Sequence, residues 1–563
     1  MLCLFYWLIS SYSYPNLFDS SDIHHPVVGK HGMVVTEERL ATQVGLDILK
    51  KGGNAVDAAC AIGYTLAVTL PKAGNLAGGG FMMIYSKKDN RVYALDYREK
   101  APKLSTKDLF LDEDGDVDSK KSRFSIYSAG VPGTVAGLEA AHQKFGLLSR
   151  RDVIQPAIDY AKKGFEMSAE LSHSLKKRHD RLSQHESTRS VFYKQERNSV
   201  FYEPGEVFKQ KDLAKTLTII KKKGKKGFYQ GDIAKKIVSY MEKNDGLITQ
   251  SDLDDYEVKW REPIEGIYKG HRVVSMPPPS SGGIALVEAL NIIENLELNT
   301  DEAHDPDNIH LISEALKFVY RDRAHYIGDM DFVEVPVEML IDKTYAADMA
   351  AEISTSNVLK LDDPDAFMMN EGDNTTHFVV ADRYGNVVSN TYTLNFSYGN
   401  GMVVEGTGML LNNEMDDFSA KPGVPNAYGL VGNDKNAIAP EKRMLSSMSP
   451  TIVFKDEQPF LVTGSPGGSR IITTVLQMIL NIVDYDMNVQ EATVMPRFHH
   501  QWKPDEIRVE RGVNATSLDI LAKRGFIIKQ GSTMGAAESI VLKDGYFFGS
   551  ADPRKPNSLA EGY

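Results

Sequence analysis

The chain contains one sharply defined β-hairpin, and its first strand opens on a threonine. Thr375 stands where a polar segment gives way to apolar and β-branched residues, and an Asp-, Gly- and Asn-rich turn at 382–386 leads into a second strand at 387–395. Because side chains alternate between the two faces of a strand, Thr393 and Asn395 share one face. The sequence therefore predicts a hydroxyl and an amide close to Thr375.

Thr375 is a candidate nucleophile. A threonine hydroxyl reacts poorly unless a base lies beside it, and cutting the chain before the threonine supplies that base as its own new α-amino group. We interpret Thr375 in this way. A Thr-Thr pair at a strand start is by itself more often a sign of β propensity, so the interpretation depends on the other motifs of the chain.

A second motif joins a buried strand to a helix through a glycine-rich turn. Residues 461–464 are mostly apolar, residues 465–469 read Ser-Pro-Gly-Gly-Ser, and apolar residues with helical spacing follow. The free amides of Gly467 and Gly468 at the start of such a helix would suit a developing oxyanion. The pattern alone also fits an ordinary turn or a phosphate site, although it lacks the P-loop and dinucleotide-binding spacings.

Charged and polar residues elsewhere suit a substrate that carries both an ammonium and a carboxylate group. Residues 412–418 concentrate amides and carboxylates that could hold an ammonium group, and Ser446 and Ser447 offer hydroxyls for a carboxylate. Arg98 ends a predicted strand, and a planar guanidinium matches a carboxylate with two parallel hydrogen bonds. Taken one at a time, an acidic run or a lone arginine more often belongs to a solvated loop.

Composition argues against several other functions. A net charge of −12 and an isoelectric point near 5.7 disfavour nucleic-acid binding, which needs a basic surface. Two cysteines, Cys3 and Cys60, imply no disulfide framework, and Cys60 lies in an apolar helical pattern as a small core residue. No histidine pair falls in a metal-ligand motif, since His499 and His500 are adjacent and tend to point apart, so we expect no metal or other cofactor.

Helices and strands alternate before the threonine-headed hairpin. We expect helices at 36–51 and 54–69, a hairpin from 81 to 97, and a helix-rich middle from about 130 to 350, followed by an irregular linker at 354–372. Residues 2–9 are apolar but too few to span a membrane. We interpret residues 1–14 as a possible secretion signal, although no lysine or arginine precedes the apolar run.

Several long motifs, in a common order, resemble those of the γ-glutamyltranspeptidases. They are residues 375–377, 391–395, 410–418, 442–450 and 463–470, together with 52–59 and 277–283 further upstream, and the likeness covers nearly the whole chain beyond about residue 30. The resemblance implies an α/β fold of the N-terminal nucleophile hydrolase type, a four-layer α/β/β/α sandwich. It also implies self-cleavage into a large subunit, 15–374, and a small subunit, 375–563, which interleave in one sandwich.

The resemblance also implies a role for each candidate residue. The self-cleavage bond would join Asn374 to Thr375, with Thr393 bonded to the nucleophile and Gly467 and Gly468 forming the oxyanion hole. The α-carboxylate of a γ-glutamyl group would be held by Arg98, Ser446 and Ser447, and its α-amino group by Asn395, Glu414 and Asp417. Tyr428 resembles the tyrosine of a lid loop that covers the bound glutamyl group.

The activity implied is that of a γ-glutamyltransferase and glutathione hydrolase. Glutathione or a similar compound would acylate Thr375, and water, an amino acid or a short peptide would resolve the intermediate. Relatives of this type are exported, so a periplasmic or secreted location is expected. Two alternatives stay open: an acylase of cephalosporins or glutaryl compounds, which would lack the zwitterion-binding residues, and an uncut, inactive precursor that only binds amino acids.

Overall fold

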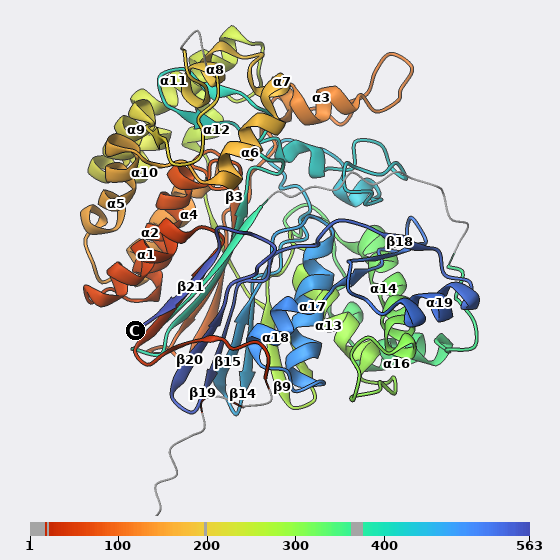
Figure 1. Ribbon diagram of the computed structural model, residues 1–563. Coiled ribbons are helices and arrows are strands. Elements are labelled where there is room, and N and C mark those ends of the chain that lie inside the picture. The colour runs from red at the N-terminus through yellow and green to blue at the C-terminus, as the bar shows by residue number, and fades with distance from the viewer. Residues whose placement is uncertain (1–16, 18, 20–21, 196–199, 362–374) are drawn as a thin grey trace, which may run out of the picture.

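The fold is a sandwich of two β-sheets between two layers of helices (Figure 1). The computed structural model describes residues 17, 19, 22–195, 200–361 and 375–563. The predicted signal at 1–14, Cys3, Asn374 and the end of the predicted linker lie outside the described residues. The four-layer α/β/β/α arrangement predicted from the resemblance is confirmed.

One sheet carries the threonine-headed hairpin at its centre. Its neighbouring strands are all antiparallel. In spatial order they are β21 (Leu559–Gly562), β2 (Gly32–Thr36), β10 (Thr376–Asp382), β11 (Val387–Thr393), β3 (Gly79–Ser86), β4 (Arg91–Asp96) and β7 (Lys259–Arg261). Both predicted hairpins, β10–β11 and β3–β4, are confirmed, and β11 pairs with β3 so that the two hairpins lie side by side.

The second sheet packs face to face on the first. Its strands, also antiparallel, follow the order β1 (Val27–Gly29), β20 (Tyr546–Ser550), β19 (Ser539–Lys543), β15 (Gln458–Thr463), β14 (Thr451–Lys455), β9 (His271–Ser275) and β8 (Ile264–Tyr268). Contacts between the sheets join β10 and β11 to β15 and β19. The glycine-rich turn that follows β15 therefore lies close to the hairpin.

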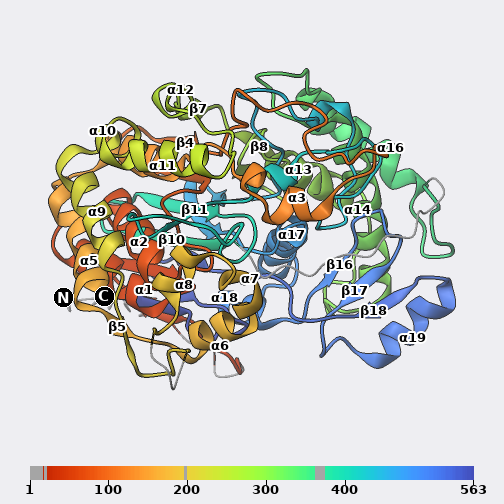
Figure 2. The same cartoon turned by 90° about the horizontal axis from the view of Figure 1, so that it is seen from above.

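Each sheet is covered on its outer face by helices, as Figures 1 and 2 show from two directions. The first sheet is covered by α1 (Arg39–Lys50), α2 (Ala55–Thr69) and α4 (Thr134–Phe145), with α5 (Arg150–Lys163) and α9 (Lys211–Lys223) outside them. The second is covered by α13 (Gly282–Ile293), α14 (Pro306–Tyr326), α16 (Lys343–Glu352), α17 (Arg470–Val483) and α18 (Val489–Val494).

Shorter elements complete the description. The remaining helices are α3 (Ser119–Phe124), α6 (Ala169–Lys177), α7 (His179–Leu182), α8 (Glu186–Phe192), α10 (Lys225–Tyr229), α11 (Asp232–Lys243), α12 (Gln250–Asp254), α15 (Val337–Leu340) and α19 (Ala515–Arg524), with 3₁₀ turns η1 (Ile126–Ser128), η2 (Glu414–Asp417) and η3 (Asp434–Asn436). Small sheets pair β5 (Phe165–Glu166) with β6 (Val207–Phe208), β12 (Val403–Val404) with β13 (Met409–Leu410), and β16 (Phe498–His499), β17 (Ile507–Val509) and β18 (Ile528–Gln530).

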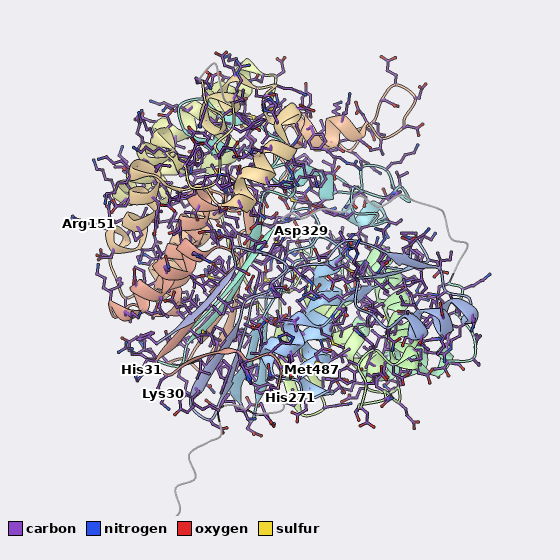
Figure 3. The ribbon with its side chains drawn as sticks, viewed as in Figure 1. Lys30, His31, Arg151, His271, Asp329 and Met487 are labelled. Carbon is purple, nitrogen blue, oxygen red and sulfur yellow. The ribbon has the colours of Figure 1, made fainter. Side chains whose placement is uncertain are left out.

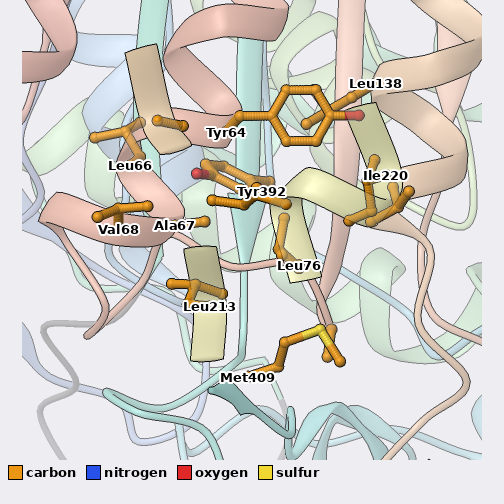
Figure 4. Close-up of a cluster of buried hydrophobic side chains, with 14 of the residues drawn as sticks. Tyr64, Leu66, Ala67, Val68, Leu76, Leu138, Leu213, Ile220, Tyr392 and Met409 are labelled. Carbon is orange, nitrogen blue, oxygen red and sulfur yellow. The ribbon is translucent and has the colours of Figure 1, made fainter. Parts of the chain in front are cut away.

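The period of two along the hairpin divides the interior into two cores. Val380 and Val388 face the helix layer and pack with α2, whose side chains appear with Tyr392 in Figure 4. Val379 and Val387 point the other way, into the core that contains the second sheet and its helices. Because every residue of β10 and β11 is buried, the hairpin is held on both faces.

The local sequence explains why α2 forms where it does. Asn54 caps its first turn by accepting hydrogen bonds from the backbone amides of Val56 and Asp57, and the Asp57 carboxylate accepts a bond from the amide of Asn54. Cys60 is fully buried in this helix, as predicted. The helix predicted at 36–51 starts later, at Arg39, because Thr36 still belongs to β2 and Glu38 caps the helix. Within the described residues, no helix is both long and apolar enough to cross a membrane.

A close contact between the sheets gives a stability prediction. A methyl group on Gly464, which follows β15, would lie 2.2 Å from Cε1 of the buried His377 ring on β10. We expect Gly464→Ala to destabilise the protein by about 1–3 kcal/mol, because the ring or the backbone must shift in a close-packed core. Thermal unfolding followed by circular dichroism measures this. Gly231→Ala is the matched control, since its new methyl group would meet no atom closer than 3.9 Å. Equal midpoints for the two variants would contradict the prediction.

Candidate active site

The hairpin brings Thr375 and Thr393 into contact. Thr375 immediately precedes β10, and Thr393 ends β11 opposite it. The hydroxyl of Thr375 donates a hydrogen bond to Oγ1 of Thr393 at 3.1 Å, and the backbone amide of Asn395 donates to the same oxygen at 2.8 Å. Thr375 is 7% exposed. The expected approach of a second hydroxyl to Thr375 is therefore present in the structure, and the amide that approaches belongs to the main chain of Asn395.

The side chain of Asn395 is fixed by two neighbours. Its Nδ2 donates to the carbonyl of Asn413 at 3.0 Å, and its Oδ1 accepts from the hydroxyl of Tyr428 at 2.7 Å. Asn395 has a φ of 69°, a left-handed conformation that asparagine tolerates better than most residues. This turn redirects the chain directly after β11, so the Asn395 amide lies at the end of the hairpin next to Thr393.

Gly467 and Gly468 lie in the turn between β15 and α17, as the sequence predicts. Their φ angles are 133° and 59°, which L-residues with a side chain rarely adopt. A methyl group on Gly468 would come within 2.6 Å of the Tyr428 ring. Tyr428 thus covers the turn at close range, and the glycine allows this approach. Ser465 anchors the turn from behind by accepting a hydrogen bond from the amide of Ala536 at 2.9 Å.

Arg98 lies in a buried cluster of carboxylates. Its side chain is fully buried, and it ion-pairs with Glu414 and, at 2.5 Å, with Asp417, while Glu99 lies 3.8 Å away. Burial raises the pKa of Glu414 well above its usual range and raises the pKa of Glu99 to about 8, with Arg98 opposing both shifts. The resemblance assigned Arg98 to the α-carboxylate of the donor, and Glu414 and Asp417 to its α-amino group. The structure joins Arg98 directly to both carboxylates.

Ser446 and Ser447 lie on a segment that is tied to several elements. Ser446 pairs with Ser280, where the 277–283 motif enters α13, through a parallel bridge, and its carbonyl accepts from the amide of Ser281 at 2.9 Å. Upstream, the backbone amide of Arg443 donates to the buried carboxylate of Asp329 at 2.8 Å, a residue labelled in Figure 3. These bonds hold the two serines at a fixed position.

All but two of the candidate residues line one pocket of about 350 Å³. The exceptions are Asn374, which lies outside the described residues, and Gly467, which neighbours Gly468 in the turn. The candidate residues of the lining are Arg98, Thr375, Thr393, Asn395, Glu414, Asp417, Tyr428, Ser446, Ser447 and Gly468. Thr393 ends β11, Glu414 and Asp417 lie in η2, and the other candidates lie outside the strands of the two large sheets. The Arg98–Asp417 bond alone spans 319 positions.

The structure adds pocket residues that sequence reasoning missed. They are Arg323, Asn426, Leu430, Leu445, Met448, Ser469 and Ile471. Asn426 and Leu430 flank Tyr428, which the sequence had already identified as a candidate. Their position in the same loop could have identified them as pocket residues. Arg323 lies in the last turn of α14, where a basic residue is common for helical reasons alone. Its sequence context gave no signal of a site.

The histidine pair does not form a metal site. Nδ1 of His499 lies 2.9 Å from the Thr473 hydroxyl, whereas Nε2 of His500 lies 3.0 Å from Asp505. Burial lowers the pKa of His499 to about 3, so its imidazole is neutral. Within the part of the chain that the structure describes, no three His, Cys, Asp or Glu residues gather as metal ligands would.

Comparisons with known proteins show the family of this chain. A family model described as Gamma-glutamyltranspeptidase matches residues 41–562. The chain is similar to the glutathione hydrolase proenzyme of Escherichia coli strain K12, with 50% identity over 546 residues that cover 96% of this chain and 93% of that protein.

Solved structures share the fold. A cephalosporin acylase from Bacillus halodurans superposes with a TM-score of 0.85 at 27% identity, and the match covers 98% of each chain. A γ-glutamyltranspeptidase from Helicobacter pylori superposes with a TM-score of 0.55 at 46% identity, covering 57% of this chain and 91% of that one.

The buried cluster gives a second stability prediction. Arg98→Gln leaves Glu414 and Asp417 without their cation, and removal of one partner from a buried ion pair costs about 3–5 kcal/mol. We expect a lower unfolding midpoint in urea, partly restored in the double variant Arg98→Gln, Glu414→Gln, which removes one of the orphaned charges. Arg91→Gln is the control, because the Arg91–Glu262 pair is exposed and worth less than about 1 kcal/mol. An Arg98→Gln midpoint equal to that of the control would contradict the prediction.

Proposed function

The chain belongs to the γ-glutamyltranspeptidase family and is an enzyme that hydrolyses glutathione and transfers its γ-glutamyl group, and we propose that Thr375 is its nucleophile. The observation that carries this assignment is the 3.1 Å hydrogen bond between the Thr375 and Thr393 hydroxyls, in a pocket that also contains Arg98 and two carboxylates.

The first step of the proposal is self-cleavage. Oγ1 of Thr375 attacks the carbonyl of Asn374, the acyl group moves from nitrogen to oxygen, and water hydrolyses the resulting ester. This releases the α-amino group of Thr375 and separates a small subunit of 189 residues (563 − 374) from the large one. The word proenzyme in the name of the E. coli relative supports such processing. In the proposed mature form the two subunits stay together as a heterodimer, because each contributes strands to both sheets.

In the second step the free α-amino group acts as the base. An α-amino group titrates at ~7.7, so an appreciable fraction is neutral at physiological pH and can take the proton from Oγ1. The alkoxide character that develops favours attack on the γ-amide carbonyl of the donor. In the uncut chain, Oγ1 of Thr393 accepts from the Thr375 hydroxyl and from the Asn395 amide, which fixes the position of Oγ1 of Thr375. After cleavage the Thr375 proton turns from Thr393 to the new amine.

The tetrahedral intermediate needs a partner for its oxyanion. The amides of Gly467 and Gly468 lie in the turn before α17, and in the proposal they donate to this oxygen. Collapse of the intermediate protonates and expels the leaving amine and leaves a γ-glutamyl ester on Thr375. Water then yields glutamate, and an amino acid or peptide yields a new γ-glutamyl compound.

Recognition of both charged groups of the glutamyl donor distinguishes this reaction from the acylase alternative. A γ-glutamyl donor carries an α-ammonium group, for which Glu414, Asp417 and Oδ1 of Asn395 are suitable acceptors in the pocket. Its α-carboxylate would be bound by Arg98 and the Ser446 and Ser447 hydroxyls. A glutaryl group lacks the α-ammonium, so it would give Glu414 and Asp417 no cation beyond Arg98. We therefore favour γ-glutamyl donors over cephalosporin side chains. A periplasmic or secreted location is proposed on the expected signal at 1–14.

The central test is Thr375→Ala. We expect the purified variant to run as one chain on a denaturing gel and to release no aniline from a γ-glutamyl anilide, because nucleophile and base are lost together. Thr393→Val should split slowly and lose at least about tenfold in kcat, since it cannot orient the hydroxyl. Thr393→Ser keeps the hydroxyl and serves as its control. Normal splitting by Thr375→Ala would refute the assignment, and full activity in an uncut wild-type chain would refute the role of the amine.

Binding of the donor should depend on pH through the buried carboxylates. Burial raises the pKa of Glu414 and of Asp417, so both lose their charge at a higher pH than ordinary carboxyl groups do. Their charged forms would hold the α-ammonium, so KM should rise as the pH falls. Glu414→Gln should weaken this acid-side rise, whereas the exposed Glu113→Gln should not. The measurement is KM for the γ-glutamyl anilide from pH 9 down to pH 5, and an identical profile in wild type and Glu414→Gln would contradict it.

A further inference from the structure

Arg323 is a buried cation in the wall of the candidate active site. It lies in the last turn of α14 and is 5% exposed. Its Nε donates to the hydroxyl oxygen of Ser281 at 3.0 Å, and its Nη2 donates to the hydroxyl oxygen of Ser447 at 3.4 Å. Arg323 lines both the main pocket and an adjoining pocket of about 320 Å³ under the Tyr428 loop.

The charge of Arg323 is not neutralised by an ion pair. No carboxylate among the described residues lies within 4.0 Å of its guanidinium, and Nη1 has no hydrogen-bond partner there. Burial lowers the pKa of Arg323 to about 10, which still leaves it protonated at neutral pH. A buried, unpaired charge is expensive, so such a group more often serves a ligand than stability. Arg98, by contrast, already pairs with Glu414 and Asp417.

The two serines have hydroxyl protons to offer. Oγ of Ser447 accepts from Arg323, and Oγ of Ser446 accepts from the backbone amide of Met448 at 3.1 Å. A hydroxyl oxygen that accepts a bond keeps its own proton for another partner. Both serines line the pocket, so a carboxylate there could accept from the two hydroxyls while facing Arg323.

We propose that Arg323 binds the α-carboxylate of the γ-glutamyl donor, through Nη1 or Nη2 directly and through the Ser447 hydroxyl that it orients. This inference rests on the proposed function. Arg98 then serves both sides of the zwitterion: it attracts the carboxylate and also holds Glu414 and Asp417 in place for the ammonium group. Arg323 supplies a second positive charge, on which Asp417 acts only from beyond ion-pair distance.

The test compares two donors that differ only in the α-carboxylate. γ-Glutamyl anilide carries it, whereas 4-aminobutyryl anilide has a hydrogen in its place and keeps the ammonium group and the scissile amide. In Arg323→Gln, we expect KM for γ-glutamyl anilide to rise roughly 10- to 100-fold, the range for a hydrogen bond to a charged group. kcat/KM for 4-aminobutyryl anilide should change less than about threefold. Arg321→Gln, on the same helix but 26% exposed, is the matched control and should leave both donors unaffected.

Competitive inhibition gives a second readout that needs no turnover of a poor donor. The inhibition constant of L-glutamate should rise in Arg323→Gln, while that of 4-aminobutyrate should not. Arg323→Lys keeps the positive charge but loses the planar guanidinium. Its inhibition constant for L-glutamate should lie between those of wild type and Arg323→Gln. This variant also serves if Arg323→Gln does not fold, which its circular dichroism spectrum shows.

The outcomes separate this inference from the proposed function. Equal losses for both donors, or no loss for either, would overturn the role of Arg323 while leaving Thr375 as the nucleophile. An equal rise in the inhibition constants of L-glutamate and 4-aminobutyrate would overturn it as well, because the effect would then not concern the α-carboxylate. Failure of the proposed function would appear in Thr375→Ala, which tests the nucleophile independently of donor binding.

Discussion

The antiparallel pairing of β10 with β11 is the contact on which the candidate site depends. Its register sets Thr376 opposite Tyr392, so the residue before one strand and the residue that ends the other meet at the same end of the sheet. A shift by one residue would turn the side chains of the moved strand to its opposite face. Burial of both faces prevents this shift, because Val379 and Val380 each fill a separate core. The short distance between the two threonine hydroxyls is thus a product of packing throughout the sandwich.

A buried arrangement of charges gives the pocket its chemistry. Arg98 and Glu414 are buried and Asp417 is 14% exposed, so each ion depends strongly on its partner. A bound zwitterion could replace the pairs within the cluster, because its carboxylate can pair with Arg98 and its ammonium group with Glu414 and Asp417. The net charge of the cluster would then not change. Arg323 differs from Arg98 because its hydrogen bonds go to neutral hydroxyls.

Close approach of backbone and ring shapes the other wall. The Gly467–Gly468 turn lies under Tyr428, and a side chain at Gly468 would collide with that ring. Tyr428 is fixed in turn by its bond to Asn395, at the end of the hairpin. The Tyr428 ring, the turn and the hairpin are therefore linked by direct contacts, which connect this wall of the pocket to the position of the two threonines.

Local sequence determined the elements and many members of the site. Turn residues and alternating apolar residues predicted both hairpins, helical spacing predicted α2, and the order of the motifs indicated the family and the residues around Thr375. These signals reach only a few positions along the chain. The pairing of Arg98 with Asp417 across 319 positions, the place of Arg323 beside Ser447, and the shared pocket were decided by the tertiary structure. The physical reason is that packing two sheets face to face determines which distant side chains share a buried space, and burial then selects their charge partners.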